Sequence, residues 1–325
     1  MNKLNDYANF FGDIKPWSGF VPSGFVVDFL GVFTDIKFNV LSGIDPALVG
    51  GSYQQTKLPS IGDGGNAEGW FEMVNWLAAA REARGRYVMI TLGAAYGGQA
   101  VGAYRAMQLV NPLPCKLVAV EPVPENYAWM IQHMRTNGID PDDHWLVQTA
   151  VGGSNEPIFF PVGAPGTGAN NSYSTNDINS RKYYVETFIS EGQTEAALRN
   201  LIEHNTTGIE KDLLPGRNAI AEIKLMSCVT LKDLISPFDV VDYLESDIQQ
   251  SEIVVFPPFI DLLRRKVRRI LIGTHGIDAH HSLHQLFADQ GWEIVFSFEP
   301  NATHNSALGQ FVTNDGILTV RNPDL

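Results

Sequence analysis

The chain has 325 residues, a formal net charge of −13 and a pI of about 5.0, and hydrophobic residues make up 44% of it. This composition supports one large domain, or one domain with an extension, and excludes wholesale disorder. Because an acidic field repels phosphate backbones and anionic lipids, we expect no nucleic-acid and no membrane partner. The chain has no apolar run near the roughly 20 residues of a membrane span and no signal sequence, so we expect a cytoplasmic protein.

The sequence has one basic run and two cysteines that could mark a binding site. The basic run Arg264 to Arg269 is expected to be the cationic last turn of a helix, which complements the helix dipole, rather than a polyanion site. Cys115 and Cys228 form no Cys-x-x-Cys pair, so the sequence gives no support to a zinc cluster or a redox motif.

Residues 1–65 are rich in glycine, proline and aromatic residues and predict an N-terminal extension or cap. Within it, two short strands hinged near Gly31 predict a β-hairpin. The segment Pro59 to Gly69 predicts a loop. The following segment, up to Gly85, has apolar residues at helical spacing and a glycine stop, which predicts an amphipathic helix.

Residues 66–325 alternate strands with helices and are expected to form the main domain. Strands are expected at 87–92, 116–122, 144–151, 157–162, 219–231, 240–246, 268–275, 292–298 and 316–320. Helices are expected at 97–110, 125–139, near 192–204, at 259–267 and at 278–291. This alternation predicts a mostly parallel sheet covered on both faces. Because the last two strands have only a loop between them, they predict an antiparallel hairpin at the sheet edge.

A glycine-rich turn follows the first strand of the main domain, in "YVMITLGAAYGG", Tyr87 to Gly98. Its spacing matches neither the dinucleotide fingerprint G-x-G-x-x-G nor a phosphate-binding loop with Gly-Lys-Ser/Thr. Glu121 ends the next strand, where a carboxylate can accept hydrogen bonds from two ribose hydroxyls. Together these features favour S-adenosylmethionine over NAD. The alternative is that the glycines only make a tight turn and that Glu121 is a solvated strand end.

An ordered series of motifs then resembles the FkbM-type family of S-adenosylmethionine-dependent methyltransferases. The series consists of "LGAAYGG", "VAVEPVPENYAWMIQHMRTNGID", "VQTAVGG", "VTLKDLI", "VDYLESDIQQSE" and "ILIGTHG". The resemblance covers most of the chain. It implies an α/β, Rossmann-like, doubly wound class I methyltransferase fold, with a mostly parallel seven-stranded sheet, a C-terminal antiparallel hairpin and the N-terminal extension described above.

The resemblance also assigns roles to residues of this chain. It implies that the Gly93 to Gly98 turn holds the methionine part of the cofactor, that Glu121 holds the ribose, and that the segment Gln148 to Val151 borders the adenine. The full set of implied cofactor contacts is Glu68, Thr91, Gly93, Ala94, Tyr96, Gly97, Gly98, Glu121, Thr149, Ala150 and Glu245. Asp247 and Glu252 match the first and last acids of the family's D-V-x-G-A-E motif, and His275 matches the histidine of I-G-T-H.

The chain departs from the family at two positions. Relatives usually have an acid where this chain has Thr91, and that acid holds the cofactor's ammonium group directly or through water. They usually have glycine where this chain has Gln250. Because a threonine hydroxyl can still accept a hydrogen bond, we expect weakened rather than lost cofactor binding.

Methyl transfer is an in-line displacement, in which the protein positions donor and acceptor and excludes water. A hydroxyl acceptor also needs its proton removed, and His275 or Asp247 is the expected base. A divalent metal held by Asp247 stays open. The alternatives are that His275 caps the helix near Asp278 and that Asp247 caps the helix after it. A Gly/Asn/Ser-rich loop at 163–180, with Tyr173 as its one large contact residue, is expected to cover the acceptor.

His280 and His284 lie at i, i+4, a spacing that suits two metal ligands on one helix face, but a solvated helix face is favoured. The leading hypothesis is a methyltransferase that acts on a hydroxyl of a sugar or secondary metabolite, so the expected partner is a small-molecule or glycan acceptor. A homo-oligomer stays open. The rivals are a non-catalytic relative that binds a partner and an NAD-linked oxidoreductase.

Overall fold

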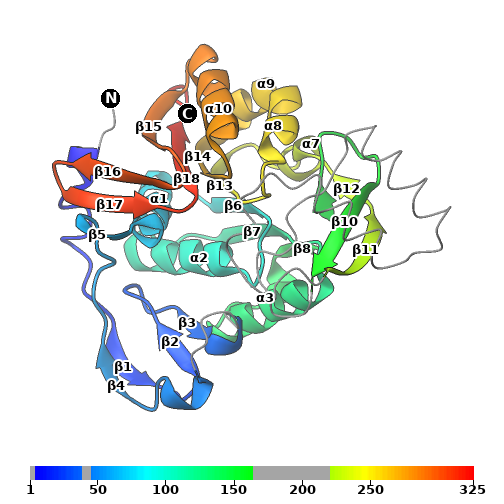
Figure 1. Cartoon of the computed structure of the whole chain (residues 1–325). Coiled ribbons are helices and arrows are strands. Elements are labelled where there is room, and N and C mark those ends of the chain that lie inside the picture. The colour runs from blue at the N-terminus through cyan, green and yellow to red at the C-terminus, as the bar shows by residue number, and fades with distance from the viewer. Residues whose placement is uncertain (1–3, 39–44, 164–219) are drawn as a thin grey trace.

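The structure is a computed structural model, and it describes residues 4–38, 45–163 and 220–325. Its centre is a seven-stranded sheet with the strand order β15-β18-β14-β13-β6-β7-β8 (Figure 1). Its strands are β6 (Tyr87–Leu92), β7 (Cys115–Val120), β8 (Trp145–Val147), β13 (Val241–Ser246), β14 (Val267–Thr274), β15 (Glu293–Phe298) and β18 (Gly316–Arg321). All neighbours pair in parallel except β18, which is antiparallel to both β14 and β15. This is the expected class I methyltransferase sheet with its antiparallel C-terminal strands.

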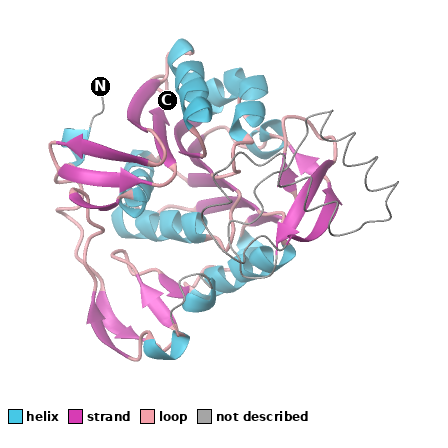
Figure 2. Ribbon diagram, viewed as in Figure 1, coloured by secondary structure: helices cyan, strands magenta, loops and turns pink. Residues whose placement is uncertain are grey.

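Helices cover both faces of this sheet (Figure 2). They are α1 (Glu68–Glu82), α2 (Gly98–Val110), α3 (Pro124–Thr136), α7 (Leu231–Ile235), α8 (Glu252–Val255), α9 (Ile260–Lys266) and α10 (Ile277–Asp289). Short 3-10 helices are η1 (Leu4–Tyr7), η3 (Pro46–Leu48), η4 (Pro141–Asp143) and η5 (Pro257–Phe259). Side chains of β6 alternate between two buried clusters: Tyr87 and Met89 pack with α1 and α2, and Val88 and Ile90 pack with α7 and α10. A fully buried strand needs apolar residues on both faces, which is why β6 lacks the polar alternation of an exposed strand.

The N-terminal extension contains the expected hairpin, with β2 (Phe25–Val27) antiparallel to β3 (Phe33–Asp35). A second pair, β1 (Ser18–Val21) with β4 (Ser52–Gln55), was not expected. The extension joins the main core, since Phe11, Phe29 and Leu30 belong to the same buried cluster as Trp70 and Phe71 of α1.

The loop expected over Pro59 to Gly69 is wrong in part. Residues Asp63–Asn66 form β5, which pairs in parallel with β17 (Gly309–Thr313). The simple loop expected between the last two strands of the sheet is also wrong, because β16 (Ala302–Ser306) and β17 form a hairpin there. All four residues of β5 are exposed, so this strand carries no apolar periodicity that a sequence could show.

The strands expected at 144–151 and 219–231 are each divided. The first ends at Val147 and resumes as β9 (Ala150–Val151), which pairs in parallel with β12 (Cys228–Val229). The second consists of β11 (Ile220–Met226), β12 and the start of α7, and β11 pairs with β10 (Ile158–Gly163). A capping box of Thr230 and Asp233 begins α7 and so ends the strand. The loop expected at 163–180 with Tyr173, and the helix expected near 192–204, lie outside the described residues apart from Gly163.

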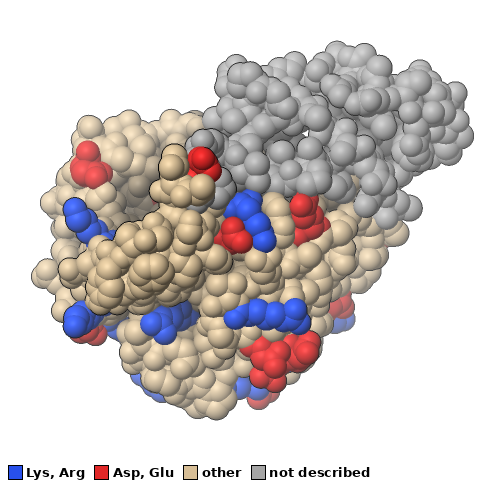
Figure 3. Space-filling view, turned by 90° about the horizontal axis from the view of Figure 1, so that it is seen from below, with Lys and Arg blue, Asp and Glu red and all other residues tan. Residues whose placement is uncertain are grey.

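The basic run 264–269 is only in part the last turn of a helix. Arg264 to Lys266 end α9, but Arg268 and Arg269 lie in β14. Arg268 pairs with Asp242, and the buried Arg269 pairs with Glu82 at 3.0 Å. Basic and acidic side chains also lie interspersed on the face shown in Figure 3. In the part of the chain that the structure describes, no helix has the length and apolar character that crossing a bilayer requires.

Candidate active site

The Gly-rich turn lies between β6 and α2, next to the tip of β13, where the strand order of the sheet reverses. Ligands of doubly wound sheets bind at such a point. Gly93 has φ +76, and a Cβ there would lie 2.1 Å from the carbonyl oxygen of Asp247. Gly97 has φ +83 and lies against Met130, whose Cγ would be 2.8 Å from an added Cβ. Both glycines therefore have a local steric reason, whatever ligand the turn holds.

The remaining residues of the turn shape the start of α2. The amide of Gly97 donates to the carbonyl of Ala94 at 2.7 Å, and Gly98 is the first residue of the helix. The ring of Tyr96 stacks on Phe38 of the N-terminal extension at 5.4 Å between centroids. Burial raises the pKa of Tyr96 to about 12, so its hydroxyl stays protonated at neutral pH. The extension thus packs directly on the turn that was assigned to the cofactor.

Glu121 lies just beyond the tip of β7 and is folded against this turn. Its Oε2 accepts a hydrogen bond from the amide of Ala95 at 2.8 Å, and its Oε1 accepts one from the amide of Val123 at 2.8 Å. The side chain is buried, not solvated as in the alternative interpretation, and desolvation raises its pKa to about 7. The ribose role of Glu121 stays a prediction.

A buried carboxyl group lies beside Thr91, the position at which the resemblance implies an acid. Thr91 of β6 is the register partner of Glu245 on β13. The Thr91 hydroxyl donates to Oε2 of Glu245 at 2.5 Å, and both residues are buried. Desolvation raises the pKa of Glu245 well above its ordinary value, and the nearby charge of Asp247 adds to this. A carboxyl group is therefore present next to Thr91, on the neighbouring strand β13.

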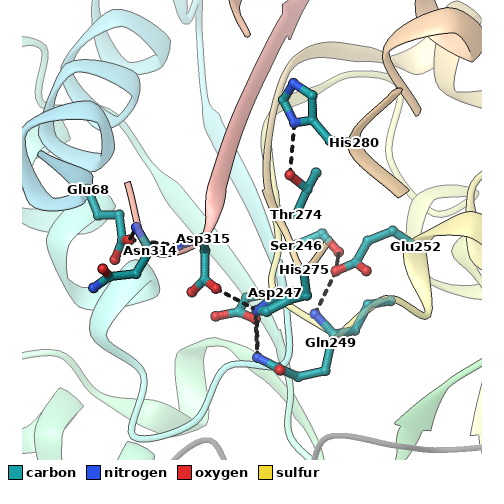
Figure 4. A network of polar contacts seen from close by, with 11 residues as sticks. Glu68, Ser246, Asp247, Gln249, Glu252, Thr274, His275, His280, Asn314 and Asp315 are labelled. Carbon is teal, nitrogen blue, oxygen red and sulfur yellow. Dashed lines mark hydrogen bonds and ion pairs between the residues drawn. The ribbon is translucent and has the colours of Figure 1, made fainter. Parts of the chain in front are cut away.

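Asp247 and His275 come together at the tips of β13 and β14, as expected. Nε2 of His275 lies 3.3 Å from Oδ1 of Asp247 (Figure 4). It also lies 3.4 Å from Oδ1 of Asp315, which the sequence interpretation missed. Neither alternative role is found: the N-cap of α10 is Gly276 and the N-cap of α8 is Ser251.

The segment after Asp247 forms a tight turn. Gln249 and Gln250 have φ values of +53 and +71, so Gln250, at which the resemblance implies a glycine, lies in the left-handed region that favours glycine. Oε1 of Glu252 accepts a hydrogen bond from the amide of Ile248 at 2.7 Å and so closes the turn. Glu252 is buried, and desolvation raises its pKa to about 7.

Two glutamates of α1 lie near Asp315 and Asp247. Oε1 of Glu68 accepts hydrogen bonds from the amides of Asn314 and Asp315, each at 3.0 Å (Figure 4). Glu72, which the sequence interpretation missed, accepts a hydrogen bond from Gln99 of α2 at 2.7 Å. Desolvation raises the pKa of Glu72 to about 7, and the charges of Glu68 and Asp247 add to it. Helical spacing of α1 could have indicated that Glu68 and Glu72 share one face.

Thr149 lies between β8 and β9, Ala150 is the first residue of β9, and the adenine border implied for both by the resemblance stays a prediction. The Thr149 hydroxyl lies 3.0 Å from the hydroxyl of Ser227, and Ala150 pairs with Cys228. These contacts fix the segment against β12.

Two histidines of α10, His280 and His284, both lie within hydrogen-bond distance of the Ser297 hydroxyl. His280 is buried, in contrast to the solvated face expected, and lies 2.9 Å from both the Thr274 and the Ser297 hydroxyls. Desolvation lowers its pKa to about 4, so it is neutral near pH 7. Across the described residues, no group of three or more His, Cys, Asp or Glu side chains has the arrangement to hold a metal ion, which gives no support to a metal at Asp247.

One known protein is similar to this chain over most of its length. No protein-family model matches the chain. It is 26% identical over 307 residues to a protein of Jannaschia sp. (strain CCS1) described as "Putative methyltransferase", across 93% of this chain and 94% of that protein. Among solved structures, precorrin-6y C5,15-methyltransferase from Geobacter metallireducens GS-15 is 12% identical, with a TM-score of 0.34 over 76% of this chain and 86% of that chain.

The methyltransferase FkbM from Methylobacillus flagellatus KT is 11% identical, with a TM-score of 0.36 over 74% of this chain and 45% of that chain. The fold and site define a Rossmann-like α/β protein with the class I methyltransferase strand order, and that assignment depends on the strand order of this chain. The FkbM type stays a resemblance.

Proposed function

We propose that the protein is an S-adenosylmethionine-dependent methyltransferase. The observation that carries the proposal is the Gly-rich turn at the point where the strand order reverses, with the carboxyl groups of Glu121 and Glu245 on either side of it. Acidic groups there complement the ammonium and sulfonium charges of S-adenosylmethionine. The turn lacks the glycine fingerprint that binds the pyrophosphate of NAD. The methyltransferase description of the relative supports the same class.

The proposed acceptor is a hydroxyl group of a sugar or secondary metabolite, a class that comes from the resemblance to FkbM-type enzymes. When bound, the cofactor supplies an electrophilic methyl group on a sulfonium that is already a good leaving group. The turn and the tips of β7 and β13 hold and orient it. Asp247 and His275 lie at neighbouring strand tips, so both can reach one acceptor hydroxyl and remove its proton.

Calorimetry with S-adenosylhomocysteine, the cofactor product, tests the proposal most directly. We expect binding with roughly micromolar affinity, about −8 kcal/mol. NADH is the matched control and is expected not to bind. No binding of S-adenosylhomocysteine at millimolar ligand would refute the proposal. Binding without methyl transfer to any member of a hydroxylated acceptor panel would instead favour the non-catalytic relative.

A further inference from the structure

A second carboxylate contacts the same ring nitrogen of His275 as Asp247 does. We propose that Asp315 is a positioning residue: with Asp247 it stabilises the protonated form of His275, and Glu68 fixes the turn that carries it. The inference rests on the proposed function, because it assigns the base of the same reaction. In this assignment the proton of the acceptor hydroxyl passes to Nε2 of His275. The carboxylates of Asp247 and Asp315 are the partners of the protonated ring.

The sheet register brings Asp315 to this place. Thr274 pairs with Gly316 in the antiparallel pair of β14 and β18. The next residues outward, His275 and Asp315, therefore face each other beyond the ends of both strands. Their Nε2 and Oδ1 atoms are 3.4 Å apart, close to the 3.3 Å between His275 and Asp247. The imidazole ring thus lies between carboxylates from two different strand tips.

Glu68 determines where the Asp315 carboxylate lies. Its single oxygen Oε1 accepts both the Asn314 and the Asp315 amides at 3.0 Å, so it ties the turn before β18 to the first residue of α1. A carboxylate that accepts two backbone amides holds its segment more tightly than a neutral acceptor does. This gives Glu68 a role in the protein itself, whatever it does toward the cofactor.

The two nitrogens of the His275 ring have different surroundings. Nδ1 of His275 is buried and has no hydrogen-bond partner among the described residues. Nε2 of His275 faces the carboxylates of Asp247 and Asp315. The side-chain amide nitrogen of Gln249 lies 2.7 Å from this ring nitrogen. The same amide nitrogen donates to Oδ1 of Asp247 at 3.0 Å, so it is a donor toward His275 as well. Gln249 therefore favours the tautomer with hydrogen on Nδ1 and a lone pair on Nε2, which is the form a base requires.

The charges of four acidic groups act on His275, and these groups come from four different parts of the chain. They are Asp247 beyond β13, Asp315 before β18, Glu252 of α8 and Glu68 of α1. Burial alone would lower the pKa of His275, but these charges more than offset it and raise the pKa above its ordinary value. A stronger base that is still neutral at a pH above its pKa is suited to deprotonating a hydroxyl.

The proton and bond changes balance with this assignment. The acceptor oxygen forms a bond to the methyl carbon as the carbon–sulfur bond breaks, and the bonding electrons stay on the sulfur of S-adenosylhomocysteine. The hydroxyl proton passes to Nε2 of His275, from which the Gln249 amide has been displaced by the acceptor. The resulting imidazolium donates to Asp247 or Asp315 and later releases the proton to solvent.

The test measures the pKa of His275 by NMR titration of the cofactor-free protein labelled with ¹³C-histidine, with the signal assigned through His275→Gln. Asp315→Asn keeps the shape of the side chain and removes its charge. We expect it to lower the pKa of His275 by about one unit, as for an opposite charge near a titrating group. Asp239→Asn, at a fully exposed position before β13, is the matched control and is expected to leave the pKa unchanged.

Glu68 provides a second, independent pair of variants. Glu68→Gln keeps an oxygen that can accept both amides, and Glu68→Ala removes it. We expect Glu68→Ala to lower the pKa of His275 more than Glu68→Gln does, because the released turn lets Asp315 move away. Equal pKa values in wild type and Asp315→Asn, or an equal shift in Asp239→Asn, would overturn the proposal. This result does not depend on a cofactor, so it is separable from a failure to bind S-adenosylhomocysteine.

In the active enzyme, Asp315→Asn is expected to shift the acidic limb of kcat to lower pH and to reduce the plateau. A merely structural role for Asp315 would reduce the rate without moving the limb. An acidic limb that stays in place while the pKa of His275 falls would mean that His275 is not the base, and it would overturn the proposal.

Discussion

Gly93→Ala is the substitution that most directly probes the turn at the centre of the site. An L-residue in the left-handed region costs about 1–2 kcal/mol. Alanine also makes the unfolded chain less flexible than glycine does, which offsets about 0.4–1 kcal/mol of this cost. The added methyl group would also lie 2.1 Å from the Asp247 carbonyl oxygen and 3.3 Å from Ile248 Cγ2. Overpacking of this kind costs about 1–3 kcal/mol, so we expect a total loss of about 1–4.6 kcal/mol in the free energy of unfolding.

Gly138→Ala separates the two contributions. Gly138 has φ +73, close to that of Gly93, but no atom lies within 4 Å of an added Cβ. Urea unfolding should therefore show a loss of at most about 1.6 kcal/mol in this control. Calorimetry should show that S-adenosylhomocysteine binds Gly93→Ala at least about tenfold more weakly, since the tips of β6 and β13 must move apart. If Gly93→Ala were as stable as Gly138→Ala and bound the ligand as wild type does, the steric reasoning would be wrong.

Three further predictions concern buried polar groups. Thr91→Val leaves Glu245 Oε2 without its donor, so we expect urea unfolding to show a loss of about 1–3 kcal/mol, while Thr91→Ser, which keeps the hydroxyl, should show much less. Arg269→Met leaves Glu82 without its buried partner and should cost about 3 kcal/mol, whereas Arg269→Met/Glu82→Leu should recover most of this loss; no recovery would contradict a role for the ion pair. Glu252 has its pKa raised from 4.5 to about 7 in the folded protein, so its contribution to stability is present below the unfolded pKa and is lost as pH rises toward the folded pKa. Glu252→Gln should therefore reduce the fall of unfolding free energy across that window by up to about 1.4 kcal/mol per pH unit, and an unchanged slope would show that Glu252 is not the group responsible.

Most of the central sheet could be predicted because its buried strands are apolar and separated by amphipathic helices. β6 and β13 are buried along their whole length, and a strand of that kind leaves a clear signal in the sequence. β5 and β16 leave none, because "DGGN" and "ATHNS" have no apolar face and become strands only through pairing with β17. Their formation depends on contacts between segments far apart in the chain, which local periodicity does not contain.

The site divides in the same way. Asp247 and His275 could be expected because each follows a recognisable strand, and parallel strands end at one edge of the sheet. Asp315 precedes its strand, so only the antiparallel direction of β18 brings it to that edge. Glu72 could be placed on the face of α1 that carries Glu68, but its contact with Gln99 depends on how α1 packs against α2.

Thr91 illustrates why a motif compared position by position can misjudge a site. The resemblance implies an acid at position 91, where this chain has Thr91, and Glu245 lies 154 positions further along the chain. Across the sheet the two are register partners, so the Glu245 carboxyl group lies on the strand next to Thr91, about 4.8 Å away. Because Glu245 is buried and bonded to Thr91, the two side chains act as one unit, and a substitution at either one should be interpreted as a change to both.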